Sequence, residues 1–145
     1  RKERQTIKGA TMKDKWETEG TKTFLGIHSN GFPNLFIMTG PQGGGGSFNF
    51  TDAIETHADY IVWMLSMMRE EGHEVVDITE EAEINYAEHC READIATAPL
   101  RDCLSYYNGH GDSEPGSLAY YGGGNWHKFR VRAQETLDTY AFESS

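Results

Sequence analysis

A run of glycines is the feature of this sequence whose residue types are best suited to chemistry. Gly43–Gly46 are contiguous and follow Gly40, Pro41 and Gln42. Glycine lets backbone N–H groups approach a ligand closely, and a helix that begins after such a turn presents its positive end to negative charge. The turn predicts a site for an anion or an electron-rich ring; a connection that binds no ligand is the alternative.

The turn matches neither of two common phosphate-binding patterns. Its glycines are contiguous, so they do not form Gly-x-Gly-x-x-Gly, and no Lys-Ser or Lys-Thr pair follows as in a Walker A loop. No Gly-x-Ser-x-Gly elbow for a nucleophilic serine is present. We therefore expect no catalytic residue within this chain alone.

Histidines and carboxylates offer weaker candidates. His57, His73 and His89 form no His-x-x-x-His or comparable ligand pair, so no metal site is predicted. The acidic side chains Asp52, Glu55 and Asp59 are spaced as on a solvated helix face. Neither group predicts chemistry of its own.

The elements around the turn predict an α/β arrangement. Strands are expected at about 23–39, from the β-rich run 23–27 and from 34–39, which is apolar on both faces as in a buried parallel strand. The glycine loop spans 40–47, and a helix of about 51–71 follows it. Helical spacing gives this helix a predicted apolar face: Ile54, Ala58, Ile61, Val62, Leu65 and Met68.

The charges and the end of this helix fit its dipole. Asp52 and Glu55 stand in its first turns, Arg69 stands in its last, and Gly72 is placed to stop it. An extended piece at 75–78 comes next, and Thr79 starts a second helix of about 80–97. A long segment of about 98–124 shows no periodicity, and a terminal helix of about 125–137 is expected before 140–142.

Composition narrows the class of protein. The 145 residues fit one domain, and a net charge of -10 disfavours binding to nucleic acid. The least charged stretch, 23–51, is broken by prolines and glycines, so no membrane span is expected. No secretory signal is recognisable, which predicts a cytoplasmic protein with Cys90 and Cys103 as thiols. The chain starts without Met, and we expect it to be the tail of a longer protein.

An ordered set of motifs resembles a known family. The set comprises Gly-Ala-Thr-Met-Lys-Asp-Lys-Trp at 9–16, Thr-Phe-Leu-Gly-Ile at 23–27, Gly-Phe-Pro-Asn-Leu-Phe-Ile-Met-Thr-Gly-Pro at 31–41, Ile-Glu-x-His at 54–57 and Ser-Tyr-Tyr-x-Gly at 105–109. Together these segments resemble the C-terminal part of Baeyer–Villiger monooxygenases, and the resemblance covers almost the whole chain.

The resemblance implies a fold, an activity and cofactors. These flavoproteins have one dinucleotide-binding domain for FAD and one for NADPH, and they use O2 to convert ketones to esters or lactones. The chain would supply closing strands of the FAD domain, together with helices and a mobile control loop at about 98–124. The FAD and NADPH fingerprints and the catalytic arginine of the family would lie in upstream domains, and the chain alone would be inactive.

The resemblance also implies site residues. Gly40, Pro41, Gln42 and Phe50 would lie by the flavin, with Phe50 in place of a methionine and contacting FAD through its backbone. Tyr106 would stand where many members have a tryptophan that contacts NADPH. The substrate-binding positions would be Gly45, Gly46, Ser47 and Phe48.

Two other functions remain open at this point. An N-hydroxylating or sulfur-oxidising flavin monooxygenase would share the scaffold, and upstream sequence would separate it from a ketone-oxidising enzyme. A non-catalytic acidic interaction module derived from such an enzyme is the second alternative.

Overall fold

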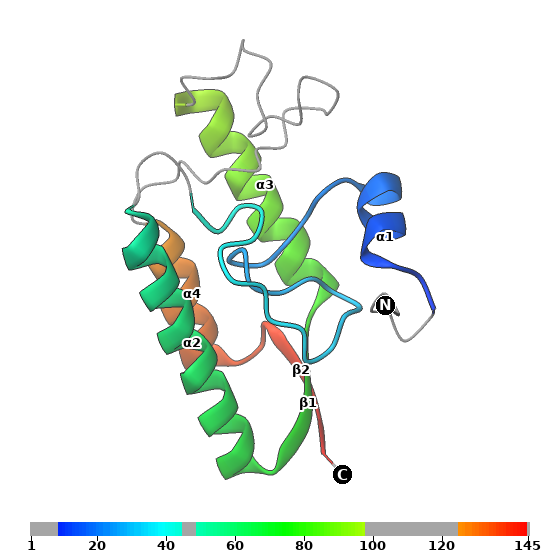
Figure 1. Ribbon diagram of the computed structural model, residues 1–145, viewed down its shortest axis with the longest axis vertical. Coiled ribbons are helices and arrows are strands. Elements are labelled where there is room, and N and C mark those ends of the chain that lie inside the picture. The colour runs from blue at the N-terminus through cyan, green and yellow to red at the C-terminus, as the bar shows by residue number, and fades with distance from the viewer. Residues whose placement is uncertain (1–8, 45–48, 98–124, 145) are drawn as a thin grey trace.

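In the residues that the structure describes, four helices and a two-stranded sheet enclose one hydrophobic core, to which an irregular segment adds Phe24, Leu25 and Ile27. The computed structural model describes residues 9–44, 49–97 and 125–144 (Figure 1). Its elements, in chain order, are α1 (Met12–Glu19), α2 (Phe50–Glu71), β1 (His73–Ile78), α3 (Glu80–Thr97), α4 (Asn125–Thr136) and β2 (Tyr140–Ser144).

The three helices expected from the sequence are present, with bounds within a residue of the predicted ones. The Asn49 side chain caps α2 by accepting a hydrogen bond from the Thr51 N–H at 2.9 Å, and Gly72 ends the helix in the left-handed conformation. Thr79 precedes α3, where its hydroxyl accepts from the Ala82 N–H at 3.3 Å. The helix ends expected at Gly72 and Thr79 are therefore confirmed, whereas the sequence analysis did not identify the Asn49 cap.

The predicted strands at 23–39 are wrong. Those residues form turns, with a single antiparallel bridge between Phe24 and His28. Leu25, Asn34 and Thr39 have φ values of 59°, 57° and 50°, which no extended strand permits. Phe24, Leu25, Ile27 and Phe32 are buried all the same, whereas Met38 is exposed. The segment folds back on itself, and the Ile37 N–H donates to the Ile27 carbonyl at 2.8 Å.

The sheet consists of β1 and β2, paired antiparallel. Ile78 stands opposite Tyr140 and Val76 opposite Phe142, with an irregularity in register between His73 and Val75. The extended piece expected at 75–78 is thus confirmed as part of β1. The sequence offered no secondary-structure assignment for 140–142, which form part of β2.

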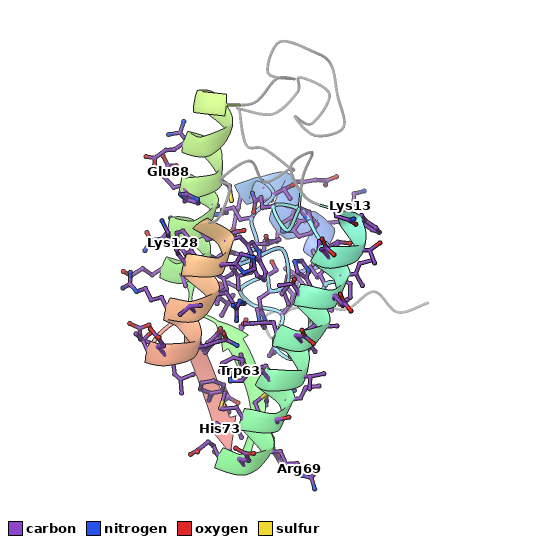
Figure 2. All side chains as sticks on the ribbon, turned by 90° about the vertical axis from the view of Figure 1, so that its left-hand side faces the viewer. Lys13, Trp63, Arg69, His73, Glu88 and Lys128 are labelled. Carbon is purple, nitrogen blue, oxygen red and sulfur yellow. The ribbon has the colours of Figure 1, made fainter. Side chains whose placement is uncertain are left out.

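Helix α2 buries a different face from the one predicted. Trp63 lies between α2 and the strands, whereas Arg69 points away from the molecule (Figure 2). Of the predicted face only Met68 is buried, while Ile54, Val62 and Leu65 are exposed. The residues of α2 that are buried are Ala53, His57, Tyr60, Met64 and Met68.

A buried ion pair ties α1 to α3. The Lys15 ammonium lies 2.8 Å from both carboxylate oxygens of Glu83 and also donates to the Ser29 hydroxyl at 3.1 Å and the Asn30 carbonyl at 2.8 Å. Helix α1 begins at a capping box formed by Thr11 and Asp14. The sequence reading did not predict this helix, whose only buried residue is charged.

A polar chain crosses the apolar core. The His28 ring nitrogen Nε2 lies 2.9 Å from the Tyr60 hydroxyl, which lies 2.6 Å from the Tyr140 hydroxyl. Burial lowers the pKa of His28 to about 3, so its ring is neutral at pH 7. In the described part of the chain, no helix has the length and apolar character needed to span a bilayer.

Candidate functional site

The turn formed by residues 40–44, called the glycine turn below, is held by backbone contacts that leave no room for side chains. Gly40 donates its N–H to the Gly26 carbonyl at 3.0 Å, and Gly43 donates to the Gly40 carbonyl at 3.0 Å. A Cβ built on Gly43 would lie 2.9 Å from the His57 ring and 3.0 Å from the Gly26 Cα. Two segments of backbone therefore meet here at a distance that only glycine permits.

Gln42 anchors the turn from inside the protein. Its side-chain oxygen accepts from the Thr23 N–H at 3.0 Å, and its amide nitrogen donates to the Thr21 carbonyl at 3.0 Å. Its backbone carbonyl accepts from the Tyr86 hydroxyl at 2.7 Å, and the Pro41 carbonyl accepts from the Thr23 hydroxyl at 2.7 Å. The side chain of Gln42, predicted to lie by a cofactor, is thus engaged within the protein and holds the turn in place.

His57 joins the turn to α2. Its Nδ1 accepts from the Thr39 N–H at 3.1 Å, so the proton of the neutral ring resides on Nε2. Burial lowers the pKa of His57 to about 4, and a hydrogen bond with the Gly43 backbone partly opposes that shift. A neutral imidazole at pH 7 fits a positioning role and does not supply positive charge.

Trp126 packs on the other side of His57. The two rings are stacked, with centroids 5.3 Å apart and planes at 10°, and the indole N–H donates to the Leu25 carbonyl at 3.1 Å. The first turn of α4 is thereby fixed against α2 and against the segment that contains Leu25.

A small cavity lies beside these rings. It measures about 180 Å³ and is lined by Gly43, Asp52, Ala53, Thr56, His57, Trp126 and His127. The Asp52 carboxylate in the lining disfavours a phosphate, whereas the aromatic and glycine surfaces suit a flat, uncharged ring. The described residues therefore fit the ring end of a flavin and not its diphosphate.

The start of α2 completes the site. The Phe50 side chain is 67% exposed at the first helical position, just after the Asn49 cap. The positive end of the helix dipole lies at this terminus and favours negative charge nearby. Phe50 is therefore exposed at the start of α2, and its predicted backbone contact with FAD stays a prediction.

The structure brings together part of the predicted site. Gly40, Pro41 and Gln42 form the turn, and Phe50 begins the helix that follows it. Gly45, Gly46, Ser47, Phe48 and Tyr106 lie outside the described residues, as does the predicted control loop. No group of three or more possible metal ligands occurs among residues that are described.

His57 and Trp126 are site residues that the sequence reading missed. The sequence analysis weighs His57 as a metal ligand and as part of a family motif but gives it no place in the site, although its position on the same helical face as Ala53 and Tyr60 signals burial. No sequence pattern predicts that Trp126 belongs to the site, because its contacts with Leu25 and His57 join residues that are far apart in the chain.

Comparison with known proteins gives one consistent result. No family model matches the chain. A Baeyer–Villiger monooxygenase of Streptomyces coelicolor is 33% identical over 137 residues, which cover 90% of this chain and 22% of that protein. The Baeyer–Villiger monooxygenase PeniC of Penicillium patulum is 32% identical over 119 residues, covering 78% of this chain and 19% of that protein.

The fold is also found in a solved structure. Cyclohexanone monooxygenase from Rhodococcus sp. Phi1, bound to NADP+, superposes with a TM-score of 0.84 at 24% identity, covering 97% of this chain and 27% of that one. The chain spans about a fifth of the length of the curated relatives it matches.

Proposed function

This chain belongs to the Baeyer–Villiger monooxygenase family, and from that premise we propose that it is the C-terminal portion of an enzyme that oxidises ketones to esters or lactones. The observation that carries the proposal is the likeness to the Streptomyces coelicolor enzyme over 90% of the chain. The whole enzyme, called the parent below, would use FAD, NADPH and O2 and would operate in the cytoplasm.

The described residues support a role in positioning the flavin. Bound FAD would supply the redox chemistry and the activation of O2. Gly40 and Gly43 allow two backbone segments of the turn to approach closely. The Gln42 side chain forms hydrogen bonds with the backbone of Thr21 and Thr23. His57 accepts a hydrogen bond from the Thr39 N–H, just before the turn. A turn fixed on several sides can present its backbone to a ring without reorganising, which is the arrangement that electrostatic stabilisation needs.

The start of α2 supports the same role. The Asn49-capped terminus carries the positive end of the helix dipole, which would stabilise negative charge on a reduced flavin and which the Asp52 carboxylate in the same first turn partly offsets. In the proposal Phe50 contacts FAD through its backbone. Gly45, Gly46, Ser47 and Phe48 line the ketone pocket, and Tyr106 contacts NADPH.

Two measurements on the parent test this function. We expect NADPH oxidation that depends on a ketone, with one oxygen atom incorporated from O2 into an ester or lactone. Oxidation of amines or sulfides without oxidation of ketones would favour the N- or S-oxidising alternative. The 145-residue chain alone should neither hold FAD tightly nor oxidise NADPH, because most of the cofactor-binding residues would lie in the upstream domains; flavin copurifying stoichiometrically with it would contradict this assignment.

A further inference from the structure

The hydrogen-bonded chain in the core plays no part in the site described above. The Tyr60 hydroxyl lies 2.6 Å from the Tyr140 hydroxyl and 2.9 Å from Nε2 of His28. Tyr60, Tyr140 and His28 are 1%, 6% and 3% exposed, so all three side chains are withdrawn from solvent. Titratable groups in such a place are costly unless each polar atom has a partner.

The direction of these hydrogen bonds follows from the partners available. Among the described residues, the Tyr140 hydroxyl has only the Tyr60 hydroxyl as a partner. A buried donor without an acceptor is destabilising, so the Tyr140 proton points to the Tyr60 oxygen. The one proton of the Tyr60 hydroxyl then points to Nε2 of His28. Burial lowers the pKa of His28 to about 3, so its ring is neutral and Nε2 offers a lone pair to that proton.

This arrangement allows the Tyr60 phenol to lose an electron within a dry core. A phenol that loses an electron becomes a strong acid, so its proton must move to a base that is already in contact. Nε2 of His28 is that base, and the hydrogen bond from Tyr140 remains to stabilise the oxygen of the resulting radical. Tyr86 is equally buried, but its hydroxyl donates to the Gln42 carbonyl at 2.7 Å, which is not a base.

Aromatic rings link Tyr60 to the surface of the protein. The centroids of the Tyr60 and Trp63 rings are 5.7 Å apart, and those of the Trp63 and Tyr140 rings are 6.4 Å apart. Both distances are those of rings in contact, between which electrons transfer readily. Trp63 lies between α2 and the strands and is only partly buried, so it connects the buried tyrosines with reductants in solution (Figure 2).

Tyr60 also lies close to the candidate site. It follows His57 by three residues on the same buried face of α2, which places it about 4.5 Å further along the helix axis. His57 is hydrogen-bonded to the Gly43 backbone and stacks on Trp126. An oxidant that forms beside the glycine turn is therefore separated from Tyr60 by about one turn of helix.

We propose that Tyr60 is a redox-active residue, which takes up oxidising equivalents formed beside the glycine turn and passes them to the surface through Trp63. The oxidant is of the hydroxyl-radical class, which arises from peroxide when oxygen is reduced without a substrate. The Tyr60 ring loses one electron, its hydroxyl proton moves to Nε2 of His28, and the hydroxyl radical becomes hydroxide. Ascorbate, or another one-electron reductant in solution, then returns an electron through Trp63 while the proton returns to the Tyr60 oxygen. The inference rests on the proposed function only for the source of the oxidant.

Photochemical oxidation of the parent tests the residue without using the flavin reaction. A flash-generated ruthenium(III) tris(bipyridine) complex should produce a tyrosyl radical that electron paramagnetic resonance detects. Tyr60→Phe should lose this signal, and Tyr86→Phe, the matched control at a buried hydroxyl that donates to a carbonyl, should keep it. His28→Gln, which keeps a hydrogen-bonding side chain but removes the base, should also lose it.

A measurement on the unsubstituted parent keeps the test valid if His28→Gln does not fold. Exchange into deuterated water should change the magnetic couplings of the protons that His28 and Tyr140 donate to the radical oxygen. The inference is overturned if Tyr60→Phe keeps the full signal, or if deuterated water leaves the couplings of the radical unchanged.

The path to the surface and the source of the oxidant have their own tests. Trp63→Phe should slow the decay of the radical in ascorbate, whereas Trp16→Phe, at a partly buried tryptophan on α1, should not. The same radical should form when the parent consumes NADPH and O2 without a ketone, and deuterated tyrosine distinguishes it from a flavin radical. An unchanged decay in Trp63→Phe, or no tyrosyl radical during that reaction, would contradict the proposed route.

Ketone oxidation by the parent is measured separately from the photochemical signal. A parent that oxidises ketones but forms no radical at Tyr60 refutes this inference alone. A radical at Tyr60 in a parent that oxidises no ketone refutes the proposed function alone.

Discussion

Lys15 and Glu83 form an ion pair that is almost entirely removed from water, with the ammonium 2.8 Å from both carboxylate oxygens. The residues are 68 positions apart and connect α1 to α3. Burial makes the two charges dependent on each other, because either one alone would lack solvation.

Removal of one partner of this pair should be costly. We expect Lys15→Met to lower the free energy of unfolding by about 3–5 kcal/mol, since it leaves a buried carboxylate without its counter-ion. Urea unfolding followed by circular dichroism measures the loss. Lys13→Met, which breaks the exposed pair with Glu17, is the control and should cost less than about 1 kcal/mol. A loss of similar size in both variants would mean that the buried Lys15–Glu83 pair contributes no more to stability than the exposed Lys13–Glu17 pair does.

The glycine turn allows a comparison between neighbouring positions. Gly43→Ala should destabilise the chain by about 1–3 kcal/mol, because the new Cβ would lie 2.9 Å from the His57 ring. Gly44→Ala should change stability by about 0.5 kcal/mol or less, since its nearest neighbour would be the Ala53 Cβ at 3.9 Å. Thermal unfolding of the two variants checks the difference, and equal midpoints would contradict the close approach described for Gly43.

Stability should fall on mild acidification. The pKa values of His57 and His28 are lowered to about 4 and about 3, so the unfolded chain binds protons at a higher pH than the folded chain does. The contribution of these residues to stability is complete above their unfolded pKa of about 6.5 and is lost as the pH falls toward 4. Burial raises the pKa of Asp77, which opposes the trend.

His57→Gln isolates one part of this pH dependence. Between pH 6 and 4.5 the variant should lose up to about 1.4 kcal/mol per pH unit from the slope of unfolding free energy against pH. Urea unfolding at several pH values measures both slopes. Identical slopes in variant and native chain would show that His57 is not buried in its neutral form.

Tyr106 provides a prediction for the parent. Tyr106→Ala should raise the apparent KM for NADPH by about threefold to tenfold, the loss of one aromatic contact, with little change in FAD content. Tyr106→Trp, which restores the residue common in the family, should keep the native KM. Steady-state kinetics and the flavin absorbance per protein decide the outcome, and an unchanged KM in Tyr106→Ala would assign the ring to packing alone.

The helices could be predicted because their signals are local. Gly72 and Thr79 mark helix ends through contacts within a few residues, and Asp52 and Arg69 fit the dipole of α2, so these signals do not depend on the rest of the fold. The face that α2 buries could not be predicted in the same way. Its sequence carries two apolar stripes, and periodicity does not indicate which of them this chain covers.

Strands and site contacts depend on residues that are distant in sequence. The run 23–39 has the composition of strands, but a strand also needs a partner, and the positive φ values of Leu25, Asn34 and Thr39 show that the segment turns instead. The sequence singled out the glycine turn, and a role for that turn at a cofactor stays a prediction. The packing of His57 on Trp126 was not predicted, because only the assembled chain brings α4 to α2.

The hydrogen bond from Trp126 to the Leu25 carbonyl closes a loop of 101 residues. Such a contact cannot form during synthesis until α4 has left the ribosome, by which time α1, α2 and α3 have already emerged. Leu25 therefore lacks this contact while the residues between it and α4 are synthesised. Truncation within α4 should consequently destabilise the packing around Leu25, near the other end of the described chain, as well as the packing of α4 itself.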